Sequence, residues 1–525
     1  MKEKILKYLA GVTEEGLFEN PAPAHPHFTR DSFESTLNPL ATKSNLRFIG
    51  RLPSVKSTDV KDSIMSIGFE TMDRDTFDPA KVIPLLGKTG VKYARCQTGW
   101  IKCEPERGVY DFKWLDDIAD GLLENGIEPW FSLSFGHPIY TPSETYRKAW
   151  AEHEKKEDIP GWARGYVGEV PMYYGEDAMQ AFINYCRETA KHFKGRVHVY
   201  EVWNEPEWFW MNNGENMRAK LGMPQATRDY VEMVRRVSEV VREIDPTARI
   251  ASVTANYASG YIQDLGKAGL GNYIDIHCFH YYGPELEAPL HDAVDHIRAC
   301  LEVPGRKLDI WQGESGRPSG HSMYPTIPTE YNQAKFLVRR LFSDAAEGLP
   351  VSSIFTASDF KKYYADGCDQ QYGLVTVRDV KPKKSFFSFQ GCGFMLDGLK
   401  RDRSMYAALE TISTQTQTTE TLPFHAKVAC FRKEGLPVFA VWQPAHVDLP
   451  HPVQIGEFCL LHESDDKMEN PIVIDPLRRN VYLVEEEYIT RTDDPRTYRT
   501  RISDFPVGDY PLLVTDLSIF EKYVK

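Results

Sequence analysis

Three features are missing from this sequence, and each absence excludes a class of protein. No run of about 18 apolar residues occurs, so we expect no membrane span. Lys2, Lys4 and Lys7 interrupt the apolar residues at the N-terminus, which therefore lack the continuous core of a signal peptide, and a cytoplasmic location is expected. Acidic residues outnumber basic ones by 75 to 62, for a net charge of −13, which argues against nucleic-acid and anionic-membrane partners.

Paired cysteine motifs and phosphate-binding glycine loops are also missing. The nine cysteines are scattered and never in Cys-x-x-Cys spacing, so we expect reduced thiols rather than a disulfide framework or a zinc finger. No Gly-x-Gly-x-x-Gly or Walker loop opens a helix, which disfavours a nucleotide-binding sheet. A chain of 525 residues buries enough surface to fold unaided, and we expect no cofactor.

The chain divides into three zones of different pattern. Residues 1–62 form an irregular N-terminal extension, residues 63–396 alternate between apolar runs and helical patterns, and residues 397–525 are rich in Thr, Val and Tyr. Turn signals separate the apolar runs of the last zone, at 427–431, 437–442, 472–474, 481–484 and 510–514, which predicts an antiparallel β-sandwich. Whether part of the extension packs on this sandwich stays open.

The middle zone contains eight short runs, most of them apolar throughout. Strands with this pattern are covered on both faces, as in a parallel sheet. Helical patterns at 112–125, 179–193, 227–244 and 330–346 lie between them. Eight such units predict an α/β fold, a (β/α)8 TIM barrel, with a doubly wound sheet as the alternative. The runs are Ser66–Phe69, Val91–Cys96, Pro129–Phe135, Val197–Trp203, Ile250–Thr254, Ile274–His280, Leu308–Trp311 and Val351–Thr356.

Two of these runs end in a carboxylate where a barrel places its active site. The fourth run continues into Asn-Glu-Pro with Glu205, and the seventh into Gln-Gly-Glu-Ser-Gly with Glu314. Because the carboxyl ends of barrel strands meet at one face, we expect the two glutamates to face each other. Glycoside hydrolysis needs such a pair: one acid protonates the leaving oxygen, and the other attacks the sugar or activates water. Taken alone, Asn-Glu-Pro also fits an ordinary polar turn.

Residues beside the two glutamates fit a sugar site. Asn204 can donate its amide to a sugar 2-hydroxyl, and Trp203 and Trp311 offer flat apolar faces for a sugar ring. We expect the aromatic cluster at 203 and 208–210 to divide between core packing and a sugar platform.

These motifs resemble those of clan A glycoside hydrolases, which have a (β/α)8 fold and retain anomeric configuration. Residues 200–206, Tyr-Glu-Val-Trp-Asn-Glu-Pro, are similar to the acid/base motif of the clan. Arg95 and the following Glu-Pro-Glu-Arg-Gly-Val-Tyr-Asp-Phe at 104–112 are similar to its arginine strand and the loop after it. The His-Tyr-Tyr ending the sixth run at Tyr282 is similar to family 39, the β-xylosidase and α-iduronidase family. The resemblance covers about residues 63–396, with an appended β-domain as in that family.

The resemblance implies a role for each matching residue. Glu205 is implied as the general acid/base and Glu314 as the nucleophile, which Arg95 would hold ionised and Tyr282 would hydrogen-bond. The implied sugar contacts are Asn204, His137 and His280, with Asp359 as a specificity contact. The segment after Pro206 and the Gly-Glu-Ser-Gly around Glu314 depart from the usual family pattern, so the sugar stays unassigned.

The predicted activity is a retaining glycosidase that removes a β-linked sugar from the end of an oligosaccharide or glycoside. A barrel that binds carbohydrate without cleaving it, and a transglycosidase, are the alternatives. His277 and His280 lie on opposite faces of a strand, so we expect no metal site there. Arg317 is one residue that could bind the carboxylate of a uronic acid. The oligomeric state, including a homo-oligomer, stays open.

Overall fold

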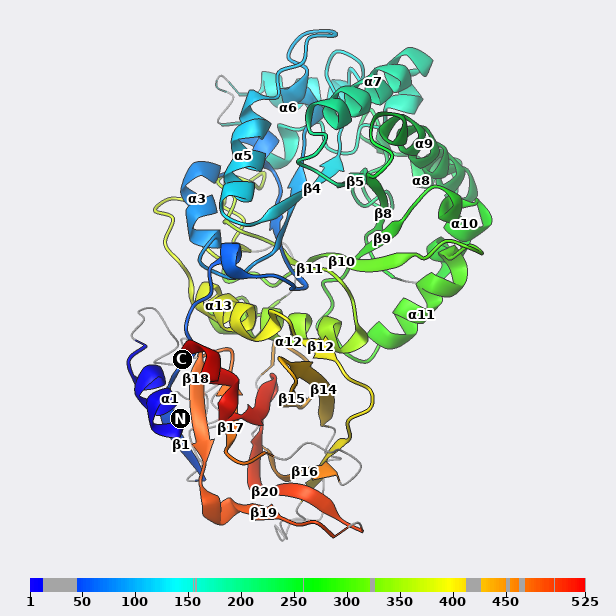
Figure 1. The fold of residues 1–525 in the computed structure, drawn as a ribbon. Coiled ribbons are helices and arrows are strands. Elements are labelled where there is room, and N and C mark those ends of the chain that lie inside the picture. The colour runs from blue at the N-terminus through cyan, green and yellow to red at the C-terminus, as the bar shows by residue number, and fades with distance from the viewer. Residues whose placement is uncertain are drawn as a thin grey trace.

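The structure is a computed structural model that describes residues 1–12, 45–153, 155, 158–257, 259–321, 326–411, 426–449, 454–461, 468–494 and 496–524. A helix-wrapped barrel fills the upper part of Figure 1 and a β-domain the lower part. Helices α12 (Glu330–Glu347) and α13 (Lys384–Leu396) lie between the two. Every helix in the described ranges is too short or too polar to span a bilayer.

Eight parallel strands form a closed barrel, which confirms the predicted fold class. Each strand pairs with the next one along the chain, and the last returns to pair with the first. The first strand is buried at all five positions, because helices cover its outer face and side chains of the barrel strands fill the interior at its inner face. The strands are β2 (Met65–Phe69), β3 (Tyr93–Gln97), β4 (Glu128–Leu133), β5 (Val199–Val202), β8 (Arg249–Thr254), β9 (Ile276–His280), β10 (Asp309–Ser315) and β11 (Ser352–Ile354).

The helices between the strands bury one apolar stripe each. In α5 (Lys113–Glu124) the buried Leu115, Ile118 and Leu122 repeat with helical period. Gly126 turns the chain into β4 with φ +77°, and a Cβ there would lie 2.5 Å from the backbone of Thr58. The other elements of the barrel region are α3 (Pro79–Leu86), α4 (Trp100–Cys103), α6 (Glu144–Ala151), α7 (Glu176–His192), β6 (Met211–Asn212), β7 (Glu215–Asn216), α8 (Met217–Leu221), α9 (Met223–Ile244), α10 (Ser259–Lys267) and α11 (Leu290–Leu301).

Two antiparallel sheets make up the β-domain, in agreement with the predicted sandwich. One has the order β1-β18-β17-β21-β15-β14-β12 and the other β13-β16-β20-β19. The strands are β1 (Leu46–Arg51), β12 (Lys400–Arg401), β13 (Ala407–Thr411), β14 (Lys427–Lys433), β15 (Leu436–Trp442), β16 (Gln454–Leu461), β17 (Pro471–Asp475), β18 (Asn480–Val484), β19 (Ile489–Arg491), β20 (Tyr498–Val507) and β21 (Leu512–Asp516).

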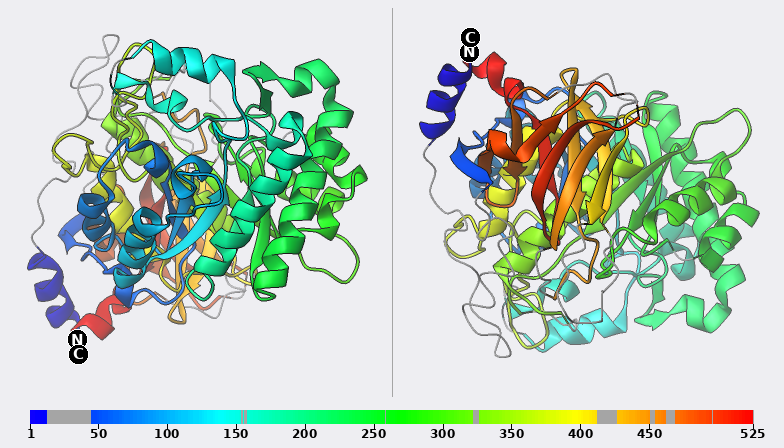
Figure 2. Two further views of the ribbon diagram at one scale, coloured as in Figure 1. Left: turned by 90° about the horizontal axis from the view of Figure 1, so that it is seen from above. Right: turned by 90° about the horizontal axis from the view of Figure 1, so that it is seen from below.

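The N-terminal part of the chain contributes to this domain. Strand β1 pairs antiparallel with β18, although more than 400 residues separate them in the sequence. In α1 (Lys2–Ala10) the ring of Tyr8 stacks on Tyr523 at 6.1 Å, and the two termini lie side by side in both views of Figure 2. The zone boundaries at 62/63 and 396/397 stay predictions.

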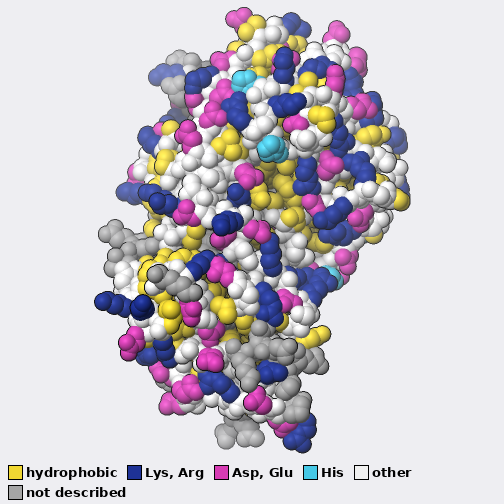
Figure 3. All heavy atoms as spheres, in the orientation of Figure 1, with side chains coloured by type: hydrophobic (Ala, Val, Ile, Leu, Met, Phe, Trp, Pro, Cys, Tyr) yellow, Lys and Arg dark blue, Asp and Glu magenta, His cyan; other side chains and the backbone are white. Residues whose placement is uncertain are grey.

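Helix α12 joins the two domains and is buried on almost every side. Its basic residues are therefore paired: Lys335 contacts Asp509 of the β-domain at 2.6 Å, and Arg339 contacts Glu287 at 2.7 Å. On the outside, basic and acidic side chains are interspersed over the face shown in Figure 3. The barrel and the β-domain thus share a buried, charged seam beneath a mixed surface.

Candidate active site

A cavity of about 670 Å³ opens at the carboxyl ends of the barrel strands. Its wall receives residues from positions at or just past the ends of all eight strands, because these ends converge at one face of a barrel. The lining residues are Glu70, Thr71, Arg74, Gln97, Phe135, Val167, Asn204, Glu205, Trp208, Phe209, Ala255, Asn256, Tyr281, Tyr282, Gly283, Glu314, Phe355, Phe360, Tyr363, Gln370 and Tyr372.

Glu205 and Glu314 meet in this cavity across 109 residues of sequence. One carboxylate oxygen of each, together with a ring nitrogen of His280, lies within 4.8 Å of the others. Nδ1 of His280 is 2.8 Å from Oε1 of Glu205 and 3.7 Å from Oε2 of Glu314. The Tyr282 hydroxyl donates to Oε1 of Glu314 at 2.5 Å. The two acids therefore share one small space in which a single bond of a bound substrate could lie between them.

Arg95 lies beneath the pair and is fully buried. Its Nη1 donates to Oε2 of Glu314 at 2.8 Å and to Oε1 of Glu70 at 3.2 Å. Its Nη2 donates to Oε1 of Glu201 at 2.5 Å and to Oδ1 of Asn204 at 2.7 Å. One guanidinium thus compensates the charge of Glu314 and fixes the orientation of three neighbouring side chains. Asn204 also lines the cavity, so this hydrogen bond positions a wall residue.

Burial shifts the pKa values of Glu205 and of its neighbour His280. Burial raises the pKa of Glu205 to about 7, against the opposing charge of Arg95. Burial also lowers the pKa of His280 to about 4, so its imidazole is neutral at pH 7. Nδ1 of His280 can then accept the proton of the acid form of Glu205 or, in the other tautomer, donate to the carboxylate form. Glu205 is thus suited to exchange a proton near neutral pH.

The turn that carries Glu205 has an unfavourable backbone. Trp203 and Glu205 have φ values of +71° and +41°, a region that side chains with a Cβ rarely adopt. The Trp203 indole compensates by burying its ring and donating to the carbonyl of Phe209 at 2.6 Å, and the carbonyl of Glu205 accepts from Trp208 and Phe209. Local packing therefore holds a strained turn that presents Asn204 and Glu205 to the cavity.

A third carboxyl group, that of Glu70, lines the cavity and did not emerge from the sequence analysis. It is 1% exposed and accepts from Arg95 and from Oγ1 of Thr356 at 3.1 Å. Burial, together with the charge of Glu314, raises its pKa to about 8. Glu70 directly follows the first apolar run, so the rule that located Glu205 could have located it too. Gly68 makes room for it, since a Cβ there would lie 2.3 Å from Oε2 of Glu70.

Arg74 and Gln97 add a polar wall that the sequence analysis also missed. The Nη2 of Arg74 donates to Oε1 of Gln97 at 2.6 Å, and its Nε lies 3.3 Å from Asp73. Among the described lining residues Arg74 is the one cation, and it is already paired. Arg317 does not reach the cavity wall, because its guanidinium contacts Asp448 at 3.0 Å.

His137 is not brought to the cavity. Its ring packs at 5.2 Å from Trp100, and its Nε2 lies 2.8 Å from the carbonyl oxygen of Glu104. Glu104 itself accepts from the Trp100 indole, the Tyr140 hydroxyl and a backbone amide of its own loop. His137 thus helps to anchor the loop after β3, and its expected sugar contact stays a prediction.

Trp311 and Asp359 also lie away from the cavity wall. Trp311 is 5% exposed and packs edge-on against Trp130 at 5.4 Å, deeper in the barrel interior. Asp359 forms an ion pair with Lys383 at 2.6 Å and accepts the amide of Gly373. Both residues therefore have structural partners, and the expected sugar contacts at these positions stay predictions.

The aromatic cluster divides as expected. Trp203 and Trp210 are completely buried and pack edge-on against each other at 5.7 Å. Trp208 and Phe209 line the cavity, and Trp208 is 61% exposed. An exposed indole at a cavity mouth offers a face on which a sugar ring stacks.

Glu205, His280 and Glu314 lie close enough to share a metal ion. Both oxygens of Glu314 already accept hydrogen bonds from Arg95 and Tyr282, and a guanidinium this near disfavours a further cation. His277, the second histidine of this strand, turns to the hydroxyl of Ser252 at 2.9 Å instead of completing a ligand set. The site therefore fits acid–base chemistry better than metal binding.

Comparisons of the sequence connect short segments of the chain to glycosidases. A family model described as beta-galactosidase matches residues 69–134. The beta-galactosidase BbgII of Bifidobacterium bifidum is 30% identical over 126 residues, 23% of this chain and 18% of that protein. The aryl-phospho-beta-D-glucosidase BglA of Bacillus subtilis is 25% identical over 195 residues, 33% of this chain and 35% of that protein. The chain thus spans far less than two thirds of these relatives.

Comparisons of the structure cover nearly the whole chain. A family 39 glycoside hydrolase from Bacteroides cellulosilyticus superposes with a TM-score of 0.59 at 15% identity, over 89% of this chain and 83% of that one. A family 39 enzyme from Xanthomonas axonopodis gives 0.50 at 15% identity, over 91% and 98%. The chain has the family 39 fold. The resemblance to clan A predicted from the motifs is therefore confirmed at the level of the family 39 fold, barrel and β-domain together.

Proposed function

We propose that this protein is a retaining glycoside hydrolase in which Glu314 is the nucleophile and Glu205 the acid/base. The observation that carries the proposal is the pair of carboxylates whose oxygens lie within 4.8 Å of each other in the cavity. This spacing fits the separation of about 5–5.5 Å in retaining enzymes better than the roughly 6.5–9.5 Å of inverting ones. The glycosidase relatives and the family 39 fold support the same reaction class.

The first step of the proposed mechanism forms a bond between the sugar and the enzyme. Oε2 or Oε1 of Glu314 attacks the anomeric carbon while the bond to the leaving oxygen breaks and Glu205 transfers its proton to that oxygen. Arg95 and Tyr282 orient the Glu314 carboxylate for this attack. A Glu205 pKa near 7 keeps a large fraction of the acid form at neutral pH.

The second step releases the sugar. Glu205, now ionised, takes a proton from water, whose oxygen attacks the anomeric carbon and displaces Glu314. The neutral His280 beside Glu205 can donate to the carboxylate in this state. Both Glu205 and Glu314 then return to their starting protonation states, and the sugar has kept its anomeric configuration.

The cavity favours a neutral sugar. The described residues of its wall include three carboxyl groups, on Glu70, Glu205 and Glu314. They include one arginine, which is already paired with Asp73. A uronate or a phosphorylated sugar would bring a further negative charge near Glu314, and the described lining residues offer no cation without a partner to compensate it. We therefore propose an uncharged β-linked sugar, removed from a chain end, and leave its identity to the substrate panel below.

A panel of aryl β-glycosides tests the proposal. It includes xyloside, glucoside and galactoside together with glucuronide and 6-phosphoglucoside, and the released phenol is measured. We expect turnover of at least one neutral member. Glu314→Gln should lower kcat by about 10⁴-fold or more and Glu205→Gln by about 10²–10⁴-fold on an unactivated glycoside.

The exposed Glu215 does not line the cavity and gives a matched control, since Glu215→Gln makes the same substitution at the surface. This variant should keep wild-type rates. No turnover of any panel member by the wild type, with sugar binding intact, would point instead to a carbohydrate-binding barrel. Sugar products longer than the substrate would identify a transglycosidase.

A further inference from the structure

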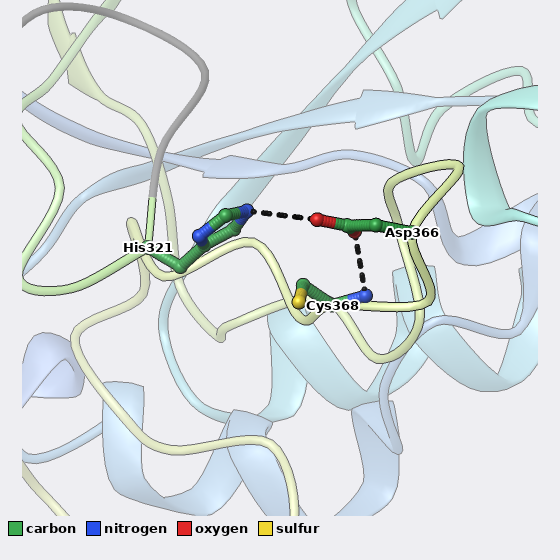
Figure 4. Close-up of side chains that lie close together, drawn as sticks. All are labelled: His321, Asp366 and Cys368. Atoms are coloured by element: carbon green, nitrogen blue, oxygen red, sulfur yellow. Dashed lines mark hydrogen bonds and ion pairs between the residues drawn. The ribbon is translucent and has the colours of Figure 1, made fainter.

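A cluster of three different donor side chains lies outside the catalytic pair. His321 follows β10, and Asp366 and Cys368 belong to the loop after β11, yet one donor atom of each lies within 4.8 Å of the other two (Figure 4). Nε2 of His321 is 3.5 Å from Oδ2 of Asp366. Cys368 is the one exposed cysteine among the nine, while the others are buried or partly buried.

The backbone holds Asp366 and Cys368 on the same side of a tight turn. Oδ1 of Asp366 accepts the amide N–H of Cys368 at 2.9 Å, which leaves Oδ2 directed at His321. Gly367 between them has φ +76°, a conformation that glycine adopts without strain. The hydrogen bond from the Cys368 amide therefore fixes the orientation of the Asp366 carboxylate, as neighbouring groups hydrogen-bond and orient the ligands in protein metal sites.

A second contact brings His321 to this turn. The amide of His321 donates to Oε1 of Gln371 at 2.8 Å, and the amide of Ser319 donates to the Gln371 carbonyl at the same distance. A Cβ at Gly320 would lie 1.6 Å from Oε1 of Gln371, so glycine leaves room for this side chain to approach. The imidazole packs edge-on against Tyr364 at 5.3 Å.

We propose that His321, Asp366 and Cys368 bind a zinc ion at the rim of the active-site cavity. Imidazole, carboxylate and thiolate together are zinc ligands, whereas Mg²⁺ and Ca²⁺ select oxygen donors alone. Bond lengths of roughly 2.0–2.3 Å in a tetrahedral site place donors about 3.3–3.8 Å apart, so small side-chain rotations suffice. The side chains of His321 and Asp366 are 45% and 54% exposed, which leaves room for water as the fourth ligand.

The ion would connect two segments that shape the substrate cavity. Tyr363, Gln370 and Tyr372 line the cavity and belong to the same loop as Asp366 and Cys368. This loop is joined to the segment after β10 at Ser319 and His321. A zinc cross-link would therefore fix one wall of the cavity without touching the bond that is cut.

Cobalt(II) titration of the full-length protein tests the site. The protein is treated with a chelator, freed of it and titrated with Co²⁺, whose bond to a thiolate gives a near-ultraviolet charge-transfer band. We expect one equivalent to bind and Zn²⁺ to displace it. Cys368→Ser should abolish the band, and His321→Ala and Asp366→Asn should each weaken cobalt binding by about tenfold or more.

Cys300 is the matched control, because its sulfur also lies near a histidine, 3.7 Å from Nε2 of His296. Cys300→Ser should leave the cobalt band unchanged. As a second measurement, Zn²⁺ should raise the Tm of the wild type by about 1–2 °C and leave Cys368→Ser unaffected. No band in the wild type at about 1 mM Co²⁺, or a band that survives Cys368→Ser, would overturn the proposal.

Discussion

Single residues around Arg95 determine the chemistry of the cavity. This guanidinium contacts Glu70, Glu201 and Glu314, so three carboxyl groups share one positive charge in a buried space. Such a set cannot ionise completely without a large electrostatic cost. Burial raises the pKa of Glu70 to about 8 and that of Glu205 to about 7, and the charge of Glu314 adds to the first and that of Glu201 to the second. Protonation of these two acids should therefore govern how activity and stability depend on pH.

The first prediction concerns the acid role of Glu205. Its raised pKa means that the proton is present below about pH 7 and lost above it. For a glycoside with a poor leaving group, kcat/KM should fall about tenfold per pH unit above that value, because protonation of the leaving oxygen is needed. A dinitrophenyl glycoside needs no such proton, so its kcat/KM should lack this limb. Identical pH profiles for both substrates would refute the assignment.

The second prediction concerns Glu70 and stability. Its pKa rises from 4.5 to about 8 on folding, so the stability it contributes is complete below pH 4.5 and is lost as pH rises through 8. Glu70→Gln cannot ionise and should lose less stability over this range. In melting curves, the Tm of Glu70→Gln relative to that of the wild type should rise by about 1–2 °C between pH 5 and pH 8. A gap that stays constant, as expected for the exposed Glu215→Gln, would contradict this.

The sequence predicted that Glu205 and Glu314 meet at one face because strand ends converge in a barrel, and the same rule would have reached Glu70 and Gln97. The same rule does not bring His137, Trp311 or Asp359 to the cavity wall, because the directions of these side chains depend on partners far along the chain. His137 turns to the Glu104 carbonyl, and Asp359 turns to Lys383. Position along a strand predicts which end of the barrel a residue occupies, but long-range contacts decide where its side chain points.

At the level of elements, α13 shows how closely helices and sheets approach each other here. A Cβ at Gly391 would lie 2.3 Å from the carbonyl of Pro476 in the β-domain, and one at Gly393 would lie 2.0 Å from the carbonyl of Thr89 in the barrel. The helix is therefore in backbone contact with both domains. Its glycines are required by this contact, although glycine lowers helix propensity.

The third prediction follows from this contact. Gly393→Ala should lower the free energy of unfolding by about 1–3 kcal/mol, since neither backbone can move aside easily. Gly260 is a matched control in α10, because a Cβ there would meet nothing within 4 Å. Gly260→Ala should be neutral or stabilising by up to about 1 kcal/mol. Urea unfolding measures both changes, and equal effects would contradict the packing argument.

Element prediction succeeded where burial was uniform. All eight apolar runs of the middle zone coincide with barrel strands, because strands covered on both faces must be apolar. Strand β20, in contrast, did not emerge from the sequence, since polar and apolar positions are mixed along it and several stay partly exposed. The runs at 437–442 and 472–474, which are buried in the sandwich, coincide with β15 and β17.

On the scale of the whole molecule, the barrel and the β-domain are held together by buried charges. Lys335 of α12 is completely buried, and its partner Asp509 is 3% exposed. Ser388 of α13 donates to the carbonyl of Leu477 at 2.6 Å across the same seam. The β-domain therefore covers surfaces of α12 and α13 that the barrel alone would expose to water.

The fourth prediction tests this seam. Asp509→Ala leaves the Lys335 ammonium buried without its carboxylate and should lower the free energy of unfolding by about 3–5 kcal/mol. The exposed pair of Lys522 and Glu434 is the control, and Glu434→Ala should cost less than about 1 kcal/mol. Chemical denaturation provides the comparison. A small effect of Asp509→Ala would mean that the two domains are stable independently of this contact.

The most direct test of the catalytic pair is covalent trapping with a dinitrophenyl 2-deoxy-2-fluoro glycoside of the sugar preferred in the panel. Mass spectrometry of the intact protein and of its peptides would then locate the attached sugar. A retaining mechanism predicts one fluorosugar per chain, attached to Glu314 and absent from Glu314→Gln. A label on any other residue, or none on an enzyme that turns over the parent glycoside, would contradict the proposed mechanism.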